Sequence, residues 1–465
     1  RTTSEVMVGE YFAATHEVAR RHGLQFSCEP YHQEHYNSME AGMQADMPMC
    51  EVWQGRGNPG HIKMMKIAVS PARMAGRRLI GCESLTSNTR PAEGGDYSPA
   101  PWDFKVVTDS ILAGGVNKMS LHIAAHNPWP DLEPGMTLGT IGQHFERSNT
   151  WWPLFHGFID YIARAQVLLQ AGRPAADLLY VQTEGTPQQR GSRYPNVTYP
   201  GQPNLMPPQG YDYDLCAPGV VLDDLRVEDG RLTLPHGTGY RVLVLPQNQP
   251  MSVRLAERVL ELAEAGAVIV AGNPPERTPG LREGADADRH LARVVERLWN
   301  HPNLISGPSI VDALKERGLA PDFQTQPNVE NSLRFIHREL AGGEHVFFVA
   351  NTTDKAMPFD ASFRVTGLCP EFWNPMDGSI FAPDDVQDDG QRTSVPLNLP
   401  PRGSMLVVLA KESAATPRPS NFETVQTLYG PWQVGFQPER GGPEEPVDFA
   451  ALTDWKDHAD ERIRY

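Results

Sequence analysis

Short apolar runs alternate with helix-length amphipathic stretches over residues 5–172, and this alternation constrains the fold more than any other feature. The apolar runs are LQFSCEP, MPMCEVW, RRLIGCES and VNKMSLHIAAH, and helical spacing of apolar residues marks the stretches around them. Alternating strands and helices predict a parallel sheet covered by helices. Four such strands are about half of a (β/α)8 barrel, so we predict that residues 1–173 form the C-terminal part of one.

A glutamate directly follows a cysteine in three of these runs. The three acids are Glu29, Glu51 and Glu83. In a (β/α)8 barrel the strand interiors fill the core, and residues at the carboxyl ends of the strands form the active site. We therefore expect each thiol to close the core and each carboxylate to follow its strand into the mouth of the barrel. Paired carboxylates there carry out glycoside hydrolysis, in which one protonates the leaving oxygen and the other activates water or attacks.

Three further segments follow the predicted half-barrel, which makes the fold class α/β plus β. Residues 174–325 predict a small doubly wound α/β domain. Its first turn, TEGTPQQRG, lacks a glycine-rich phosphate-binding pattern, so a structural or substrate-flanking role is favoured over a nucleotide site. Residues 326–412 predict an antiparallel β-sandwich. Residues 418–465 predict the start of another β-rich, sandwich-like domain, with ERIRY in a strand-like pattern.

Charge, hydropathy and cysteine content argue against several classes of function. The formal net charge of −16 opposes binding to nucleic acid and fits a neutral substrate such as a sugar. No run of about 18 apolar residues is present, so no membrane insertion is expected. Five cysteines without paired spacing predict neither a disulfide framework nor a zinc site. The chain starts at Arg1 without an apolar leader, and we expect it to be a piece of a longer polypeptide.

Polar and aromatic residues accompany the first two acids. The loop CEPYHQEHYN carries His32, whose neighbours match no helical zinc motif, so we favour hydrogen bonding to a sugar. Trp53 lies two positions after Glu51, which suits a pyranose because its C–H face stacks on an aromatic ring while its hydroxyls meet acids. The alternative is that Trp53 anchors the core and Glu51 pairs with an arginine.

Two later loops add groups that can bind sugar hydroxyls. SLHIAAHNPWPD contains His126 just past the fourth apolar run, and GTIGQHFERSNTWW contains Gln143, His144 and Trp151. We predict that these four side chains contact the substrate, as do Glu29, His32 and Trp53. The same oxygen-rich set is compatible with a hard divalent cation.

The order of four blocks, MPMCEVW, IGCESLTS, HIAAHNPWPDLEPGMT and GQHFERSNTWW, resembles the catalytic domain of the glycoside hydrolase family 106 α-L-rhamnosidases. The resemblance extends into the C-terminal β regions and covers most of the chain. It implies a (β/α)8 barrel flanked by β-rich modules, and release of terminal α-L-rhamnose from glycans or glycosides with inversion and the help of Ca²⁺. Rhamnose-containing oligosaccharides, polysaccharides or glycosides would then be the partners.

The resemblance also implies roles for two of the acids. Glu83 corresponds to the general base, because the base of the family lies in the block that IGCESLTS matches. Glu51 is implied as a metal or substrate contact. The general acid of the family lies much earlier in the chain than the base, which places it upstream of residue 1. Polysaccharide degradation implies a periplasmic or secreted protein.

Two other functions agree with the same residues. A retaining glycosidase of the β-galactosidase type would use Glu51 and Glu83 as a pair about 5–5.5 Å apart, whereas inversion needs about 6.5–9.5 Å. A non-catalytic carbohydrate-binding protein would use the aromatic and polar loops for affinity alone.

Overall fold

The computed structural model of the chain consists of two compact units, residues 1–417 and 418–465, and each is described by itself. None of the described helices combines the length and apolar character that a membrane crossing requires. The structure describes residues 2–31, 36–54, 58–87, 97, 99–129, 131–132, 136, 141–184, 207–280, 284–307, 309–413, 415–416 and 425–464, with only the backbone for 58–64.

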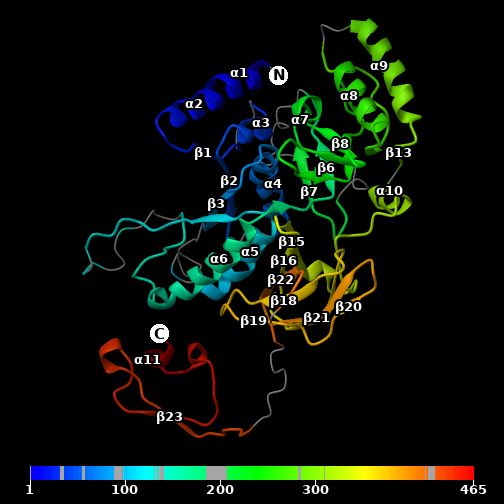
Figure 1. Cartoon of the computed structure of the whole chain (residues 1–465). Coiled ribbons are helices and arrows are strands. Elements are labelled where there is room, and N and C mark those ends of the chain that lie inside the picture. Colours follow the sequence, from blue (N-terminus) through cyan, green and yellow to red (C-terminus); the bar gives the residue numbers. More distant parts are fainter. Residues whose placement is uncertain are drawn as a thin grey trace. The chain divides into compact units, whose positions relative to one another are not determined.

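A four-stranded parallel sheet begins the first unit (Figure 1), with β1, β2, β3 and β4 adjacent in chain order. The predicted alternation of strands and helices is confirmed, although the sheet is open and the described residues contain no closed barrel. The strands are β1 (Ser27–Cys28), β2 (Met47–Trp53), β3 (Gly81–Thr86) and β4 (Lys118–Leu121). The helical segments are α1 (Thr2–Val6), η1 (Met7–Phe12), α2 (Ala13–Arg21), α3 (Ser38–Met43), α4 (Asn58–Met74), α5 (Pro101–Ala113), η3 (Trp152–Leu154) and α6 (His156–Leu169).

The two faces of this sheet differ because side chains alternate along a strand. On one face Cys50, Val52 and Cys82 are buried against apolar residues of α4 and α5. The predicted placement of these two thiols in the core is confirmed. The other face carries Met49 directly opposite Gly81, and a Cβ at Gly81 would lie 2.4 Å from Met49 Cγ, so only glycine fits that position.

A five-stranded parallel sheet follows, in the order β13-β12-β11-β6-β7, with apolar clusters on both of its faces. The RLTL segment lies in a small antiparallel sheet, in the order β10-β9-β8. The strands are β6 (Leu178–Val181), β7 (Tyr213–Cys216), β8 (Arg226–Glu228), β9 (Arg231–Thr233), β10 (Gly239–Tyr240), β11 (Val242–Val244), β12 (Val268–Ala271) and β13 (Leu304–Ser306), and the helices are α7 (Pro218–Asp223), α8 (Val253–Glu264), α9 (Gly284–Trp299) and α10 (Ile310–Glu316).

Two antiparallel sheets, ordered β19-β18-β22-β16-β15-β5 and β14-β17-β21-β20, enclose a common apolar core. Strands β5 and β14 come from positions before residue 326, so the sandwich draws on earlier parts of the chain. The strands are β5 (Arg173–Pro174), β14 (Phe323–Gln324), β15 (Leu333–Glu339), β16 (His345–Asn351), β17 (Met357–Phe363), β18 (Cys369–Trp373), β19 (Ile380–Phe381), β20 (Gln387–Asp388), β21 (Thr393–Leu399) and β22 (Ser404–Ala410), with the short helix η5 (Glu330–Ser332) before β15.

Helix α4 joins the four-stranded sheet to the five-stranded sheet through buried ion pairs. Lys66 Nζ lies 2.8 Å from Asp212 Oδ1, and Arg73 Nη1 lies 2.8 Å from Asp212 Oδ2 and 3.1 Å from Asp214 Oδ2. The Tyr240 hydroxyl donates to Asp214 Oδ2 at 2.9 Å. One helix is therefore fixed by apolar packing on one side and by charge on the other.

Helices α5 and α6 join the four-stranded sheet to the sandwich in a similar way. Lys105 Nζ lies 2.5 Å from Asp109 Oδ2 and donates to the Ser404 hydroxyl at 3.2 Å. The Tyr161 hydroxyl lies 2.8 Å from Ser404 Oγ. Because Ser404 begins β22, this polar cluster ties the helices behind the first sheet to a strand of the sandwich.

The second unit contains an antiparallel pair, β23 (Trp432–Val434) and β24 (Val447–Phe449). The strand-like pattern predicted at ERIRY is wrong, because Glu461–Arg464 form the helix α11. Asp460 begins this turn, since its carboxylate accepts a hydrogen bond from the Arg462 amide at 2.9 Å. Two short helices complete the unit, η6 (Pro438–Arg440) and η7 (Trp455–Asp457).

Candidate active site

Two acids of the neighbouring strands β2 and β3 lie side by side on the sheet face that carries Met49 and Gly81, which we call the open face. Glu51 of β2 is directly opposite Glu83 of β3 in the parallel register. The prediction that these carboxylates follow the ends of their strands is wrong, because both strands continue beyond the acids through pairing of Trp53 with Thr86. Neighbouring strands are about 4.8 Å apart, so the two side chains share one small region. Glu29 directly follows β1, as predicted.

A β-bulge follows Glu83. Val52 is opposite Ser84, but Trp53 is opposite Thr86, so Leu85 is an extra residue in β3. Leu85 has a φ of +67°, a left-handed conformation that a bulky side chain rarely adopts. Its side chain is fully buried in an apolar cluster with Phe104, Phe145 and Phe155.

Each carboxylate receives a hydrogen bond from a nearby side chain. The Tyr31 hydroxyl lies 2.7 Å from Glu29 Oε2 and 3.2 Å from Glu51 Oε2. Trp53 donates its indole Nε1–H to Glu51 Oε1. The predicted neighbourhood of Trp53 and Glu51 is therefore seen as a direct contact, and the Tyr31 hydroxyl bridges two of the three acids.

Burial and neighbouring negative charge act together on Glu29. The pKa of Glu29 is raised to about 7, mainly by burial and also by the charges of Glu83 and Glu51, against the lowering effect of the Tyr31 hydrogen bond. Near neutral pH a fraction of Glu29 therefore keeps its proton. A protonated carboxyl beside ionised ones is an arrangement found in hydrolytic active sites.

His122 lies beside Glu83, although the sequence did not single it out. Its Nδ1 lies 3.9 Å from Glu83 Oε1, and the two side chains are 20% and 27% exposed. Its backbone pairs with Gln143, whose amide donates to the His122 carbonyl at 2.9 Å. The predicted substrate contact Gln143 thus follows the same edge of the site, with its side chain fully buried.

A second polar cluster surrounds the predicted contact His144. The rings of His144 and Tyr97 lie 4.6 Å apart, and the Tyr97 hydroxyl donates to Glu146 Oε1 at 3.1 Å. Asn127 donates its amide N–H to Glu146 Oε2, also at 3.1 Å. Glu146 is nearly buried. Sequence reasoning missed it although it selected Gln143, His144 and Trp151 from the same loop, because its partners Tyr97 and Asn127 come from distant segments.

The remaining predicted contacts are placed differently. Trp151 packs among Phe104, Phe145 and Phe155 and donates its Nε1–H to the Pro99 carbonyl at 3.1 Å, which gives it a packing role. His126 is exposed on the segment after β4. His32 lies outside the described residues.

The described residues do not form a complete calcium site. Nowhere in the described part of the chain are three or more His, Cys, Asp or Glu side chains arranged to hold a metal ion. Calcium takes six to eight oxygen ligands. Glu51, the predicted metal contact, already accepts hydrogen bonds from Trp53 and Tyr31. Glu51 therefore offers carboxylate oxygens, but the described residues around it do not complete a ligand cage.

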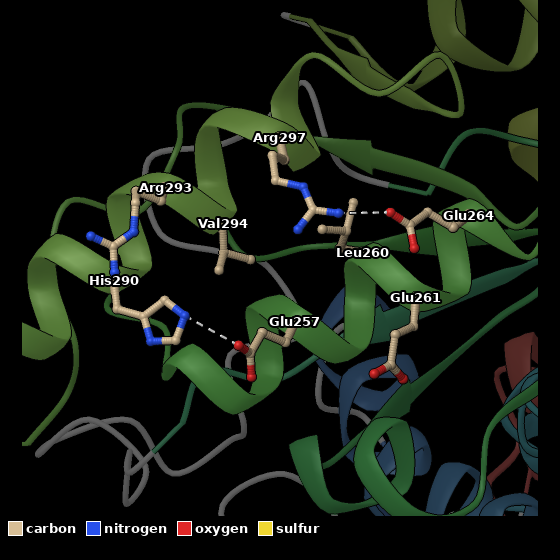
Figure 2. A pocket seen from close by; sticks show the side chains of 8 residues that line it. All are labelled: Glu257, Leu260, Glu261, Glu264, His290, Arg293, Val294 and Arg297. Atoms are coloured by element: carbon tan, nitrogen blue, oxygen red, sulfur yellow. Dashed lines mark hydrogen bonds and ion pairs between the residues drawn. The ribbon is translucent and has the colours of Figure 1, made fainter.

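A groove of about 560 Å³ lies between α8 and α9, where Figure 2 shows acidic side chains of one helix facing basic side chains of the other. Glu257 lies 3.3 Å from His290, and Glu264 lies 3.1 Å from Arg297. These polar groups are exposed, and no predicted site residue lines the groove. It is a solvated contact between two helices.

A parallel α/β sheet that carries facing carboxylates beside a tryptophan, next to a β-sandwich, has the groups that glycoside hydrolysis requires. The family model described as alpha-L-rhamnosidase, glycoside hydrolase family 106, matches residues 1–383. The chain therefore belongs to glycoside hydrolase family 106.

Three known proteins are similar to this chain in sequence or in fold. A rhamnosidase from Novosphingobium sp. PP1Y superposes with a TM-score of 0.85 and 28% identity, over 99% of this chain and 44% of that one. A protein from Formosa agariphila named "Putative beta-glucuronidase" is 32% identical over 418 residues, which are 89% of this chain and 34% of that protein. An alpha-L-fucosidase isoenzyme 2 from Paenibacillus thiaminolyticus, at 11% identity and a TM-score of 0.52 over 87% of this chain and 71% of that one, shares the fold alone. The chain thus spans about a third of the curated relative and less than half of the rhamnosidase.

Proposed function

We propose that the protein releases terminal α-L-rhamnose from glycans or glycosides with inversion at the anomeric carbon. The observation that carries the proposal is the Glu83 carboxylate on the open sheet face, partly exposed and next to Glu51. Family membership and the similarity to a rhamnosidase support the substrate class.

In this mechanism Glu83 is the general base. It removes a proton from a water molecule as that water attacks the anomeric carbon opposite the leaving oxygen. Trp53 offers its ring to the C–H face of the sugar, and Glu29, Gln143 and His126 are proposed to bind its hydroxyls. The developing positive charge of the transition state is stabilised by the nearby carboxylates.

The general acid is a separate group from Glu51. Inversion needs the two carboxyl groups about 6.5–9.5 Å apart, whereas directly opposite residues of neighbouring strands lie closer together. We propose that the acid belongs to a segment upstream of residue 1, in a longer protein whose barrel this sheet completes. The coding sequence upstream of Arg1 tests this directly. An upstream sequence without further strand–helix repeats would contradict it.

Calcium is a separate proposal, with Glu51 as one of its contacts. The ion would add positive charge beside the sugar hydroxyls. Isothermal titration with L-rhamnose, before and after chelation and again after addition of Ca²⁺, tests the proposal. Equal affinity in all three states would exclude it.

A retaining mechanism is the second candidate, because the register brings Glu51 and Glu83 close enough for a pair at about 5–5.5 Å. The first-formed product anomer, followed by NMR, separates the two mechanisms. A β-rhamnose product from an α-L-rhamnoside indicates inversion, and an α product indicates retention.

The substitution Glu83→Gln tests catalysis against simple carbohydrate binding. In the protein as it is encoded, we expect turnover of an aryl α-L-rhamnoside to fall by about 10²–10⁴-fold while L-rhamnose binding persists. Glu264→Gln, at an exposed glutamate of α8, is the matched control and should keep full activity. Retained turnover in Glu83→Gln would show that Glu83 is not the base.

We also propose that the protein is periplasmic or secreted, and cell fractionation checks this location.

A further inference from the structure

Glu83 and Thr86 are three residues apart in one strand, a spacing that normally puts two side chains on opposite faces. The extra residue Leu85 changes this parity. With Trp53 opposite Thr86 and Glu51 opposite Glu83, both β3 side chains point to the open face of the sheet. The bulge thus brings a hydroxyl to the carboxylate.

Thr86 and Glu83 form a short hydrogen bond, and Thr86 is the buried partner. Thr86 Oγ1 donates to Glu83 Oε1 at 2.6 Å, and Thr86 is fully buried. A hydroxyl that donates to a carboxylate makes a strong, directional bond. His122 Nδ1 also approaches Oε1, at 3.9 Å. Both neighbours therefore act on the same oxygen of Glu83.

The bulge itself is held by packing. A left-handed backbone at a bulky residue costs free energy and persists only where the surroundings impose it. The Leu85 side chain is fully buried with Phe104, Phe145 and Phe155, and this burial imposes the conformation. Aromatic packing on one side of the strand therefore fixes a polar contact on the other.

We propose that Thr86, presented by the Leu85 bulge, is a positioning residue that holds the Glu83 carboxylate by Oε1 and so directs Oε2 to the attacking water. This inference rests on the proposed role of Glu83 as base. Thr86 touches neither water nor sugar in this scheme, and its effect on the reaction passes through Glu83.

The test uses Thr86→Val, which keeps the shape of the side chain and removes the hydroxyl. In the full-length protein, we expect kcat on an aryl α-L-rhamnoside to fall by about 10–100-fold while KM stays within about twofold. A misplaced catalytic group slows the chemical step more than it weakens binding. Thr86→Ser should restore kcat to within about threefold of the starting protein, since it returns the hydroxyl.

Ser84→Ala is the matched control. Ser84 belongs to the same strand and is equally buried, but its hydroxyl donates to the Cys82 carbonyl at 2.9 Å. Its removal should leave kcat unchanged. An equal loss of kcat in Ser84→Ala and Thr86→Val, or unchanged kcat in Thr86→Val, overturns the inference.

A crystal structure of Thr86→Val gives a readout that does not depend on activity. We expect the Glu83 carboxylate to rotate away from its position while the backbone of β3 stays in place. A carboxylate that keeps its position overturns the inference even if kcat falls. Failure of the proposed function is seen separately, as full turnover in Glu83→Gln.

Discussion

Two sets of acids in the first unit are held in opposite ways. Asp212 and Asp214 lie at the contact between α4 and the five-stranded sheet, where Lys66 and Arg73 pair with them. Glu51 and Glu83 lie on the open sheet face with Glu29 beside them, and among the described residues these carboxylates accept hydrogen bonds from the neutral side chains of Tyr31, Trp53 and Thr86.

Asp212 in the first set and Glu29 in the second differ in acidity accordingly. Burial alone would raise the pKa of Asp212, but the charges of Lys66 and Arg73 together lower it well below its ordinary value. Glu29, whose charged neighbours Glu83 and Glu51 are negative, has a pKa raised to about 7. Neighbouring cations favour the ionised form of a carboxylate. Neutral hydrogen-bond donors orient a carboxylate without placing a positive charge beside it.

Removing a cation from the anchored set should have the largest effect. Arg73→Met leaves Asp214 and Asp212 with one cation between them, and breaking a buried pair costs about 3–5 kcal/mol. Urea unfolding of the variant measures the loss of free energy. Arg297→Met, at an exposed arginine of α9, is the control and should change the unfolding midpoint little. A similar small change in Arg73→Met would remove the distinction between the two sets.

The raised pKa of Glu29, in the second set, should be visible in how stability depends on pH. Because the folded-state pKa of Glu29 is raised from 4.5 to about 7, the folded protein binds its proton more tightly than the unfolded chain does. Stability from this group is complete below about pH 4.5 and is lost as the pH rises to 7, by on the order of 2 kcal/mol.

Glu29→Gln removes this titrating carboxyl group, so the free energy of unfolding should change less between pH 4.5 and 7. Denaturant unfolding at several pH values measures both profiles. Asp212 acts with the opposite sign, since its lowered pKa gives stability that is lost only as the pH falls below about 4. A profile of Glu29→Gln that still slopes downward over the same range would contradict the assignment.

The last prediction concerns the Tyr31 hydroxyl, and its readout is a pKa. Tyr31→Phe keeps the ring and removes the hydrogen bonds to Glu29 and Glu51. Because that bond lowers the pKa of Glu29, its loss should raise the pKa further. Carboxyl ¹³C NMR of the variant, with Glu29→Gln for assignment, measures the change. A lowered pKa would show that the hydroxyl does not stabilise the ionised form.

The sequence predicted helices and strands better than it predicted contacts between side chains. The run MPMCEVW matches β2 from Met47 to Trp53, because apolar alternation reports directly on a buried strand. The position of Glu83 inside β3 was not predicted, since a strand continues as far as its neighbour pairs with it, and pairing is not encoded locally. The bulge at Leu85 likewise depends on aromatic residues more than 15 positions away.

Polar partners from loops were the hardest to predict. Tyr97 and Asn127 meet at Glu146 only after the chain has folded, because no periodic pattern relates their positions. Trp151, an aromatic residue in a polar loop for which a sugar contact stays a prediction, packs against an apolar cluster that the sequence did not indicate. Residue type identified candidates, and packing decided their roles.

The attachment of α5 and α6 to β22 sets an order of events during synthesis. Strand β22 lies inside the six-stranded sheet, between β18 and β16, yet it is the last of the six to leave the ribosome. Its first residue, Ser404, is 299 positions after Lys105 and 243 after Tyr161. A nascent chain that ends before Ser404 leaves part of the apolar face of α6 and one edge of β16 uncovered. The packing of α5 and α6 is therefore completed only after β22 has been made.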